Sequence, residues 1–211
     1  MGKLIDWKNN INTSELEECV NIIKNGGIAV FPTDTVYGIG TNAFCKQSVN
    51  KIYEIKKRPN EKPLSILVNN KEDIEKYAII NNNIERKIID NFMPGAITII
   101  LERKQGILDY IAPEKNTIGI RIPNNKIILN ILEKLKLPIV APSANMSGEP
   151  SSATLNDIID IFKDKVDVCI DGGKCEVSEA STIVQVINGE IVIIREGIIT
   201  KKDIENVINK N

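Results

Sequence analysis

The stretch Gly27-Ile-Ala-Val-Phe-Pro-Thr-Asp-Thr-Val-Tyr-Gly-Ile-Gly40 joins a short apolar run to a polar segment that ends in two glycines. The run Ile28 to Phe31 predicts a buried strand, and Pro32 ends it because proline has no N–H to donate to a neighbouring strand. The segment Thr33-Asp-Thr35 then places polar side chains at the strand's end, where open α/β sheets bind ligands. An ordinary exit from a strand into a loop would give the same pattern, so this stretch alone leaves both interpretations open.

Apolar runs alternate with amphipathic segments along the rest of the chain. Further strands are predicted at residues 64–68, 96–101, 117–122, 138–141, 166–170, 181–187 and 190–195. Helices are predicted at residues 14–25, opened by a capping box at Ser14 to Glu17, and at 48–57, 71–77, 84–92, 127–135 and 155–162. Thr200 and Asp203 open a last helix at about 200–209.

The order of these elements predicts the fold class. The dipeptide Asn188-Gly189 indicates a hairpin between the last two strands, so the sheet is expected to be mixed. We therefore predict a single α/β domain over residues 1–211, with its core at about 14–197 and a twisted mixed sheet flanked by helices.

Composition restricts the class of protein. The chain has 211 residues, of which 42% are hydrophobic and 26% charged, as is typical of a globular domain. The net charge of −1 gives no overall attraction to nucleic acid or membranes, so any anion-binding surface must be local. No apolar run approaches the ~20 residues of a membrane span, and the N-terminus lacks a signal-peptide pattern. We expect a cytoplasmic protein without a membrane partner.

The sequence contains four cysteines without a C-x-x-C pair, and it contains no histidine. In a cytoplasmic chain we expect the cysteines to be reduced and mostly buried, and we expect no metal site. The absence of histidine also removes the Ser-His-Asp and Cys-His systems of nucleophilic catalysis. Any chemistry must therefore proceed without imidazole.

Three predicted strands are adjacent to loops rich in small and hydroxyl-bearing residues, at 33–35, 143–145 and 178–182. Small residues let a ligand approach backbone N–H groups closely. For any single loop, a turn without function is the simpler explanation. Three such loops at strand ends favour a ligand crevice.

Basic residues form a second group, made up of Lys56, Lys57, Arg58 and Lys62 together with Arg121 and Arg195. Cations at a helix C-terminus can simply complement its dipole. Arg121 and Arg195 differ because each lies at the end of an isoleucine-rich strand, where a buried arginine needs a counter-anion. Since arginine binds phosphate and carboxylate through two N–H groups, a nucleotide triphosphate or a carboxylate substrate would satisfy several of these cations.

The segment Gly38-Ile-Gly-Thr-Asn-Ala43 matches the G-x-G-x-x-A fingerprint of dinucleotide-binding folds. That fingerprint requires glycines directly after a strand and at the start of a helix. Here Pro32 and five further residues intervene, so we do not predict a dinucleotide cofactor.

Taken in order, these motifs resemble the YrdC/TsaC family of L-threonylcarbamoyladenylate synthases. The resemblance covers about residues 14–197 and rests on Phe31-Pro-Thr-Asp-Thr-Val-Tyr-Gly-Ile-Gly40, Lys56-Lys-Arg-Pro59, Lys62-Pro-Leu64, Pro94-Gly-Ala-Ile-Thr98, Thr117 to Pro123, Ala141-Pro-Ser-Ala-Asn145, Ser181-Thr-Ile183 and Arg195-Glu-Gly197. It implies a single-domain enzyme with a concave basic face. It also implies a reaction in which L-threonine, bicarbonate and ATP give threonylcarbamoyl-AMP and pyrophosphate, for threonylcarbamoyladenosine modification of tRNA.

The resemblance also implies roles for individual residues. Those expected to contact threonine are Thr35, Leu67, Arg121, Ala141 and Ser181, and those expected to contact ATP are Arg58, Lys62, Thr117, Ser143, Asn145, Ser151 and Arg195. Lys56 and Arg58 are expected to act in catalysis near the phosphates. The chain departs from many relatives in having Ala180 where they have glutamate, and from some in having Leu67 where they have histidine, which makes contacts at these positions less secure.

The implied chemistry needs negative charge neutralised more than it needs a strong base, so Lys56, Arg58 and Lys62 suit it. Magnesium is expected to enter with ATP, because the sequence shows no dedicated carboxylate cluster. Further expected partners are downstream threonylcarbamoyl-transferase proteins and tRNA or double-stranded RNA.

Three alternatives remain open at this point. A YciO-like paralogue would share the fold and the basic residues but have weak or different nucleotide activity. An RNA-binding module without catalysis is disfavoured by an aromatic content of 4% and by the net charge of −1. A carbamoyl-phosphate-using enzyme would ignore threonine.

Overall fold

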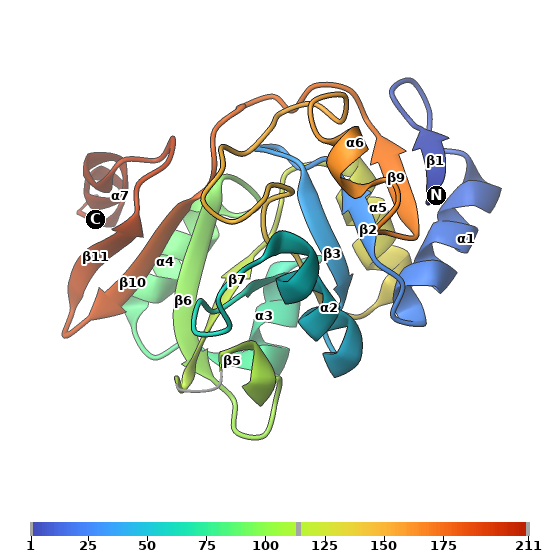
Figure 1. The fold of residues 1–211 in the computed structure, drawn as a ribbon. Helices are drawn as coiled ribbons and strands as arrows, with labels where there is room; N and C mark the ends of the chain where they lie inside the picture. Colours follow the sequence, from blue (N-terminus) through green and yellow to red (C-terminus); the bar gives the residue numbers. More distant parts are fainter. Residues whose placement is uncertain (1, 113–114, 210–211) are drawn as a thin grey trace.

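The structure is a computed structural model that describes residues 2–112 and 115–209 (Figure 1). Strands in the first part of the chain are β1 (Lys3–Asp6), β2 (Ala29–Phe31), β3 (Gly38–Asn42), β4 (Ser65–Leu67), β5 (Ala78–Ile79) and β6 (Ile97–Arg103). Those in the second part are β7 (Thr117–Arg121), β8 (Ile139–Val140), β9 (Val168–Asp171), β10 (Thr182–Ile187) and β11 (Glu190–Arg195).

These strands of the described residues form one sheet of eleven, in the order β1-β9-β2-β3-β8-β4-β7-β6-β10-β11, with β5 paired to β6. Strand β9 runs parallel to both its neighbours, β1 and β2, whereas β3 runs antiparallel to both of its own. The last pair, β10 and β11, is the antiparallel hairpin predicted from Asn188-Gly189. The predicted single α/β domain with a mixed sheet flanked by helices is confirmed.

Helices cover the sheet on both sides. They are α1 (Thr13–Lys24), α2 (Lys46–Lys56), α3 (Lys71–Tyr77), α4 (Asn83–Phe92), α5 (Lys126–Leu135), α6 (Ile159–Phe162) and α7 (Lys201–Ile208), with a short 3₁₀ helix at Asp109–Ile111. The pair α1 and α5 packs beside β1, β2 and β9, and the pair α4 and α7 packs near the β6–β10–β11 end (Figure 1). In the described residues, no helix has the length and apolar character needed to cross a membrane.

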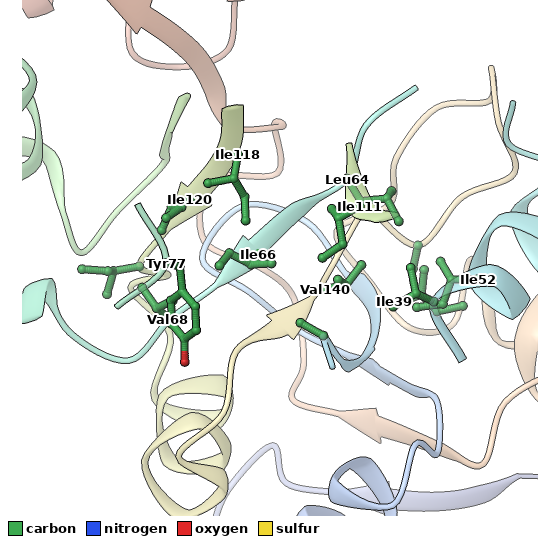
Figure 2. Packing of buried hydrophobic residues seen from close by; sticks show 14 of the residues in the cluster. Ile39, Ile52, Leu64, Ile66, Val68, Tyr77, Ile111, Ile118, Ile120 and Val140 are labelled. Carbon is green, nitrogen blue, oxygen red and sulfur yellow. The ribbon is translucent and has the colours of Figure 1, made fainter. Parts of the chain in front are cut away.

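Two apolar clusters hold these layers together. The smaller cluster joins the buried faces of α1 and α5 to strand residues such as Ala29 and Phe31. The larger cluster joins α2, α3 and α4 to the central strands, where Ile39, Ile66 and Val140 interdigitate (Figure 2). Because every strand from β9 to β6 carries side chains fully removed from water, the centre of the sheet is a rigid support for the loops at its ends.

Strand β3 was not predicted, and its glycines explain why. Glycine is unfavourable in strands in general, yet a Cβ added at Gly40 would lie 2.6 Å from the carbonyl oxygen of Val140. Gly40 is therefore required for the close approach of β3 to β8. The glycines of the G-x-G-x-x-A match lie within a strand antiparallel to β2 and not in a turn that opens a helix.

Two other local predictions need correction, and two short strands were missed. The cap of α1 is Asn12, whose side chain accepts the N–H groups of Ser14 and Glu15, so Ser14 is not the capping residue. Of the helix predicted at 155–162, only Ile159–Phe162 is α-helical. Strands β1 and β5 were also missed; β1 precedes the expected core and pairs with β9, far along the chain. By contrast, α7 has the predicted capping box between Thr200 and Asp203.

Candidate functional site

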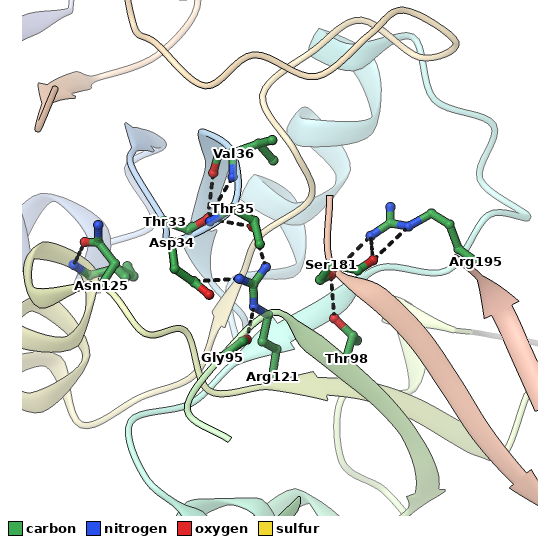
Figure 3. Close-up of polar contacts among 11 residues, drawn as sticks. Thr33, Asp34, Thr35, Val36, Gly95, Thr98, Arg121, Asn125, Ser181 and Arg195 are labelled. Carbon is green, nitrogen blue, oxygen red and sulfur yellow. Dashed lines mark hydrogen bonds and ion pairs between the residues drawn. The ribbon is translucent and has the colours of Figure 1, made fainter. Parts of the chain in front are cut away.

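Arg121, the last residue of β7, lies at the centre of the candidate site and is 7% exposed (Figure 3). Its Nη2 forms an ion pair with Asp34 Oδ1 at 2.6 Å, and its Nη1 donates to Thr35 Oγ1 at 2.9 Å. Its Nε donates to the carbonyl oxygen of Gly95 at 3.0 Å. Burial lowers the pKa of Arg121, and the Asp34 carboxylate acts against that shift. The counter-anion expected for a buried strand arginine is thus supplied by the protein itself.

The turn after β2 presents Asp34 and Thr35 to this arginine. Thr33 Oγ1 accepts the N–H groups of Thr35 and Val36 and donates to the carbonyl oxygen of Val36 at 2.6 Å. Asp34 is 4% exposed and Thr35 is fully buried. The Thr33 hydroxyl therefore stabilises the turn, and the turn holds Asp34 and Thr35 in position to contact Arg121.

The three polar loops meet in one pocket, as predicted. All five residues expected to contact threonine line it: Thr35, Leu67, Arg121, Ala141 and Ser181. Three of the seven residues expected to contact ATP, Arg58, Ser143 and Arg195, line the same pocket. Residues as far apart in sequence as Thr33, after β2, and Arg195, in β11, thus line one pocket.

Ser181 connects two sides of the pocket. Its hydroxyl lies 3.0 Å from Thr98 Oγ1. Arg195 Nη2 donates to the carbonyl oxygen of Ser181 at 2.6 Å and to its hydroxyl oxygen at 3.1 Å (Figure 3). Thr98 also lines the pocket, although sequence reasoning did not select it. Thr98 is the last residue of the motif Pro94 to Thr98, and its hydroxyl within that motif is the signal that could have identified Thr98 as a site residue.

Arg58 and Arg195 add positive charge to the lining of the pocket. Arg58 is half-buried and donates to the carbonyl oxygens of Lys62 and Pro63 at 3.2 and 3.0 Å. Among the residues that the structure describes, neither arginine has a carboxylate partner. Partial removal of the guanidinium groups from water lowers the pKa of both arginines, and the nearby Arg58 charge lowers that of Arg195 further. A buried arginine was expected to need a counter-anion. Arg195 is exposed as a residue, so this expectation does not apply to it.

Lys56, at the end of α2, is 1% exposed and contacts the loop that follows β8. Its Nζ donates to the carbonyl oxygens of Ser143 and Asn145 at 2.5 and 2.6 Å, and to Asn145 Oδ1 at 3.2 Å. Burial, with the Arg58 charge as a second cause, lowers the pKa of Lys56 to about 8. In this arrangement the ammonium group holds a loop.

The remaining residues expected to contact ATP lie outside the first pocket. Asn145 and Ser151 line a neighbouring pocket, and the Asn145 amide holds its own loop by donating to the carbonyl oxygen of Glu149 at 2.5 Å. Lys62 is exposed and Thr117 is half-buried, and neither lines either pocket. Their roles stay predictions.

Asp34 is the residue that sequence reasoning missed at the centre of the site. It stands in the quoted opening stretch, but only Thr35 was selected from that stretch as a site residue. The signal was present, because a predicted buried arginine and an aspartate in a buried polar turn are natural partners.

Three cysteines are buried thiols, and burial raises the pKa of Cys169 and Cys175 to about 11 and that of Cys19 to about 12. Such thiols stay protonated near neutral pH and are poor nucleophiles.

Comparisons with known proteins agree with this geometry. Residues 21–197 match the model of the Sua5/YciO/YrdC family, which is described as "Telomere recombination". A relative from Methanocaldococcus jannaschii, provisionally named a threonylcarbamoyl-AMP synthase, is 45% identical over 90% of each chain. The threonylcarbamoyl-AMP synthase of Pyrococcus abyssi is 31% identical over the whole of this chain, which spans 62% of that relative's length.

Solved structures show the same likeness. The crystal structure of P. abyssi Sua5 complexed with L-threonine superposes with a TM-score of 0.93 at 31% identity, covering 98% of this chain and 61% of that one. Escherichia coli YciO superposes with a TM-score of 0.85 at 24% identity, covering 94% of this chain and 97% of that one, which is evidence about the fold alone.

Proposed function

The chain belongs to the Sua5/YciO/YrdC family, and we propose that it is an L-threonylcarbamoyladenylate synthase, an ATP-using transferase that serves the threonylcarbamoyladenosine modification of tRNA. Its substrates are L-threonine, bicarbonate and ATP. The observation that carries the proposal is that all five residues expected to hold threonine, from separate segments of the chain, line one pocket together with Arg58 and Arg195. The likeness to synthases and to a threonine complex supports it.

We name two parts of the site by their proposed ligands. The threonine end consists of Thr35, Leu67, Arg121, Ala141 and Ser181, and the nucleotide end consists of Arg58, Ser143 and Arg195. At the threonine end, three atoms of the Arg121 guanidinium are anchored by protein acceptors, which leaves two of its five N–H bonds to receive a carboxylate. Leu67 and Ala141 offer apolar contact to the threonine methyl group.

The reaction divides into two bond-forming steps. The threonine amine combines with bicarbonate to give a carbamate and water. A carbamate oxygen then attacks the α-phosphorus of ATP, the bond from that phosphorus to the bridging oxygen breaks, and pyrophosphate leaves. Arg58 and Arg195 neutralise the charge that develops on the phosphates, and one pocket that holds both reactants removes much of the entropic barrier.

Magnesium is proposed to accompany ATP. The described residues contain no group of three or more histidine, cysteine or acidic side chains that could hold a metal ion. Phosphate oxygens and water are therefore its proposed ligands, as is common for this hard cation. The proposed contribution of magnesium is to neutralise phosphate charge.

The proposed partners beyond the substrates are proteins that transfer the threonylcarbamoyl group to tRNA. Binding of tRNA or double-stranded RNA to this chain, the concave basic face and the cytoplasmic location stay predictions.

The test is pyrophosphate release by purified protein supplied with ATP, magnesium, bicarbonate and L-threonine, with each component omitted in turn. We expect release to require both threonine and bicarbonate. Serine and valine serve as controls, because one lacks the threonine methyl group and the other replaces the hydroxyl with a methyl group. Detection of threonylcarbamoyl-AMP by mass spectrometry identifies the product.

Other outcomes would replace the proposal. ATP binding without threonine-dependent release would favour a YciO-like activity. Turnover of carbamoyl phosphate and ATP without threonine would favour the carbamoyl-phosphate-using class. RNA binding that is steeply salt-dependent, in the absence of nucleotide binding, would favour a module without catalysis.

A further inference from the structure

Lys56 has a contact pattern that a phosphate-binding lysine does not need. An ammonium group has three N–H bonds, and here three acceptors lie within 3.2 Å of Nζ: two carbonyl oxygens, of Ser143 and Asn145, and the Asn145 side-chain oxygen. At 1% exposure, the group has no open side toward solvent. A phosphate oxygen could reach Nζ only by displacing one of these acceptors.

The main chain of the same residue adds a further contact. The N–H of Ser147 donates to the carbonyl oxygen of Lys56 at 2.9 Å. The segment 143–147 is therefore attached to the end of α2 at residues 143, 145 and 147. Ser143 lines the first pocket and Asn145 the second, so the attached segment contributes to both.

We propose that Lys56 is a positioning residue, whose ammonium group holds segment 143–147 in the shape that receives the nucleotide and which does not itself contact phosphate. The nucleotide part of this inference rests on the proposed function. The loop-holding part does not, because every contact that carries it lies within the protein. Arg58, two residues further on, differs in lining the pocket directly.

The first experiment measures amide hydrogen exchange in the ligand-free protein. We compare the wild type with Lys56→Met, which keeps an unbranched chain but removes the donors, and with the control Lys51→Met, an exposed position on the same helix. Exchange of amides 143–147 is expected to be about 10-fold faster or more in Lys56→Met and unchanged in Lys51→Met. Unchanged exchange in Lys56→Met would overturn the proposal, whatever the protein's activity.

The second experiment separates loop holding from phosphate contact. We measure dipolar coupling between ¹⁵N-labelled Lys56 Nζ and the phosphorus atoms of bound ATP by solid-state NMR and expect no phosphorus atom at hydrogen-bonding distance from Nζ, whereas direct phosphate contact would place one there. Lys56→Arg keeps the charge, but its planar fork does not match three convergent acceptors, and it also covers the case in which Lys56→Met fails to fold. We expect Lys56→Arg to raise the KM for ATP about 10-fold and to leave the KM for threonine nearly unchanged.

Two further outcomes distinguish failure of the Lys56 proposal from failure of the proposed function. Wild-type kinetics in Lys56→Arg, combined with a large loss of kcat in Lys56→Met, would mean that charge near phosphate is what matters. If ATP does not bind to the wild type at all, the proposed function fails, while the exchange measurement still decides whether Lys56 holds the loop.

Discussion

At the threonine end of the pocket Arg121 is buried and forms an ion pair with Asp34, whereas at the nucleotide end Arg58 and Arg195 are more exposed and contact only carbonyl and hydroxyl oxygens. The first arrangement is complete without a ligand, because the protein supplies the counter-anion. The second leaves positive charge uncompensated by any described carboxylate. The comparison suggests that the threonine end is held rigid by its own network, while the nucleotide end gains its electrostatic partner only when phosphate binds.

The largest expected effect is on catalysis at the nucleotide end. Arg58→Ala should lower kcat/KM by about 10³-fold, because removal of one group that stabilises charge in the transition state commonly costs this much. The free energy of unfolding should change by less than about 1 kcal/mol, since the side chain is half-buried and has only carbonyl partners. Steady-state pyrophosphate release and urea denaturation measure the two quantities. Wild-type turnover in this variant would show that phosphate does not bind here.

Much of this comparison could be predicted from the sequence, and the exceptions have physical causes. Arg121 and Arg195 both stand at the ends of isoleucine-rich strands, so the sequence predicted a strand arginine in each case. The residues next to Arg121 and Arg195 in the sequence do not show which of the two is buried, because burial depends on the neighbouring strands in the sheet. β11 lies at an edge with one neighbour, and β7 lies between β4 and β6.

Asp34 and Lys56 show the same limit. The ion pair joins residues 87 positions apart, and the Lys56 contacts span 87 and 89 positions. Local patterns predict the elements that carry these residues but not the pairs. Strand β3 was missed for a related reason, since the requirement for Gly40 arises only when Val140 packs against it.

The second prediction tests the threonine end. Arg121→Met should raise the KM for threonine and also lower the free energy of unfolding by about 3–5 kcal/mol, because it leaves the Asp34 carboxylate buried without a partner. The double variant Asp34→Asn/Arg121→Met should recover part of that stability but none of the threonine use. Chemical denaturation and threonine-dependent kinetics of the single and double variants measure both. A loss of threonine use without a loss of stability would contradict the inference that the ion pair between Arg121 and Asp34 stabilises the ligand-free protein.

A third, smaller effect is expected where the two ends meet. Arg195→Ala should lower kcat/KM by about 10-fold, since Arg195 adds charge to the pocket lining and also holds Ser181 through its carbonyl and hydroxyl oxygens. The KM values for ATP and threonine should both rise, which distinguishes it from Arg58→Ala and Arg121→Met. Lys202→Ala, at an exposed position on α7, is the matched control. A change in only one of the two KM values would assign Arg195 to one end.

The last expected effect is a pH dependence of stability that separates Lys56 from the arginines beside it. Burial and the Arg58 charge lower the pKa of Lys56 to about 8 in the folded protein, against 10.5 as the ordinary value. Between these two pH values the unfolded chain binds a proton that the folded protein has released, so this contribution makes the protein more stable as pH rises. The difference in free energy of unfolding between the wild type and Lys56→Met should shift in favour of the wild type through this window, by at most about 1.4 kcal/mol per pH unit.

Urea denaturation of both proteins from pH 7 to pH 10.5 measures this difference, and groups that titrate alike in the two proteins, such as the buried cysteines, cancel from it. A flat difference would mean that the Lys56 ammonium is as well solvated or paired in the folded protein as in water. The loop contacts would then offset the cost of its burial, and Lys56 would resemble Arg121, whose charge is compensated inside the protein, more than Arg58, whose charge awaits a ligand.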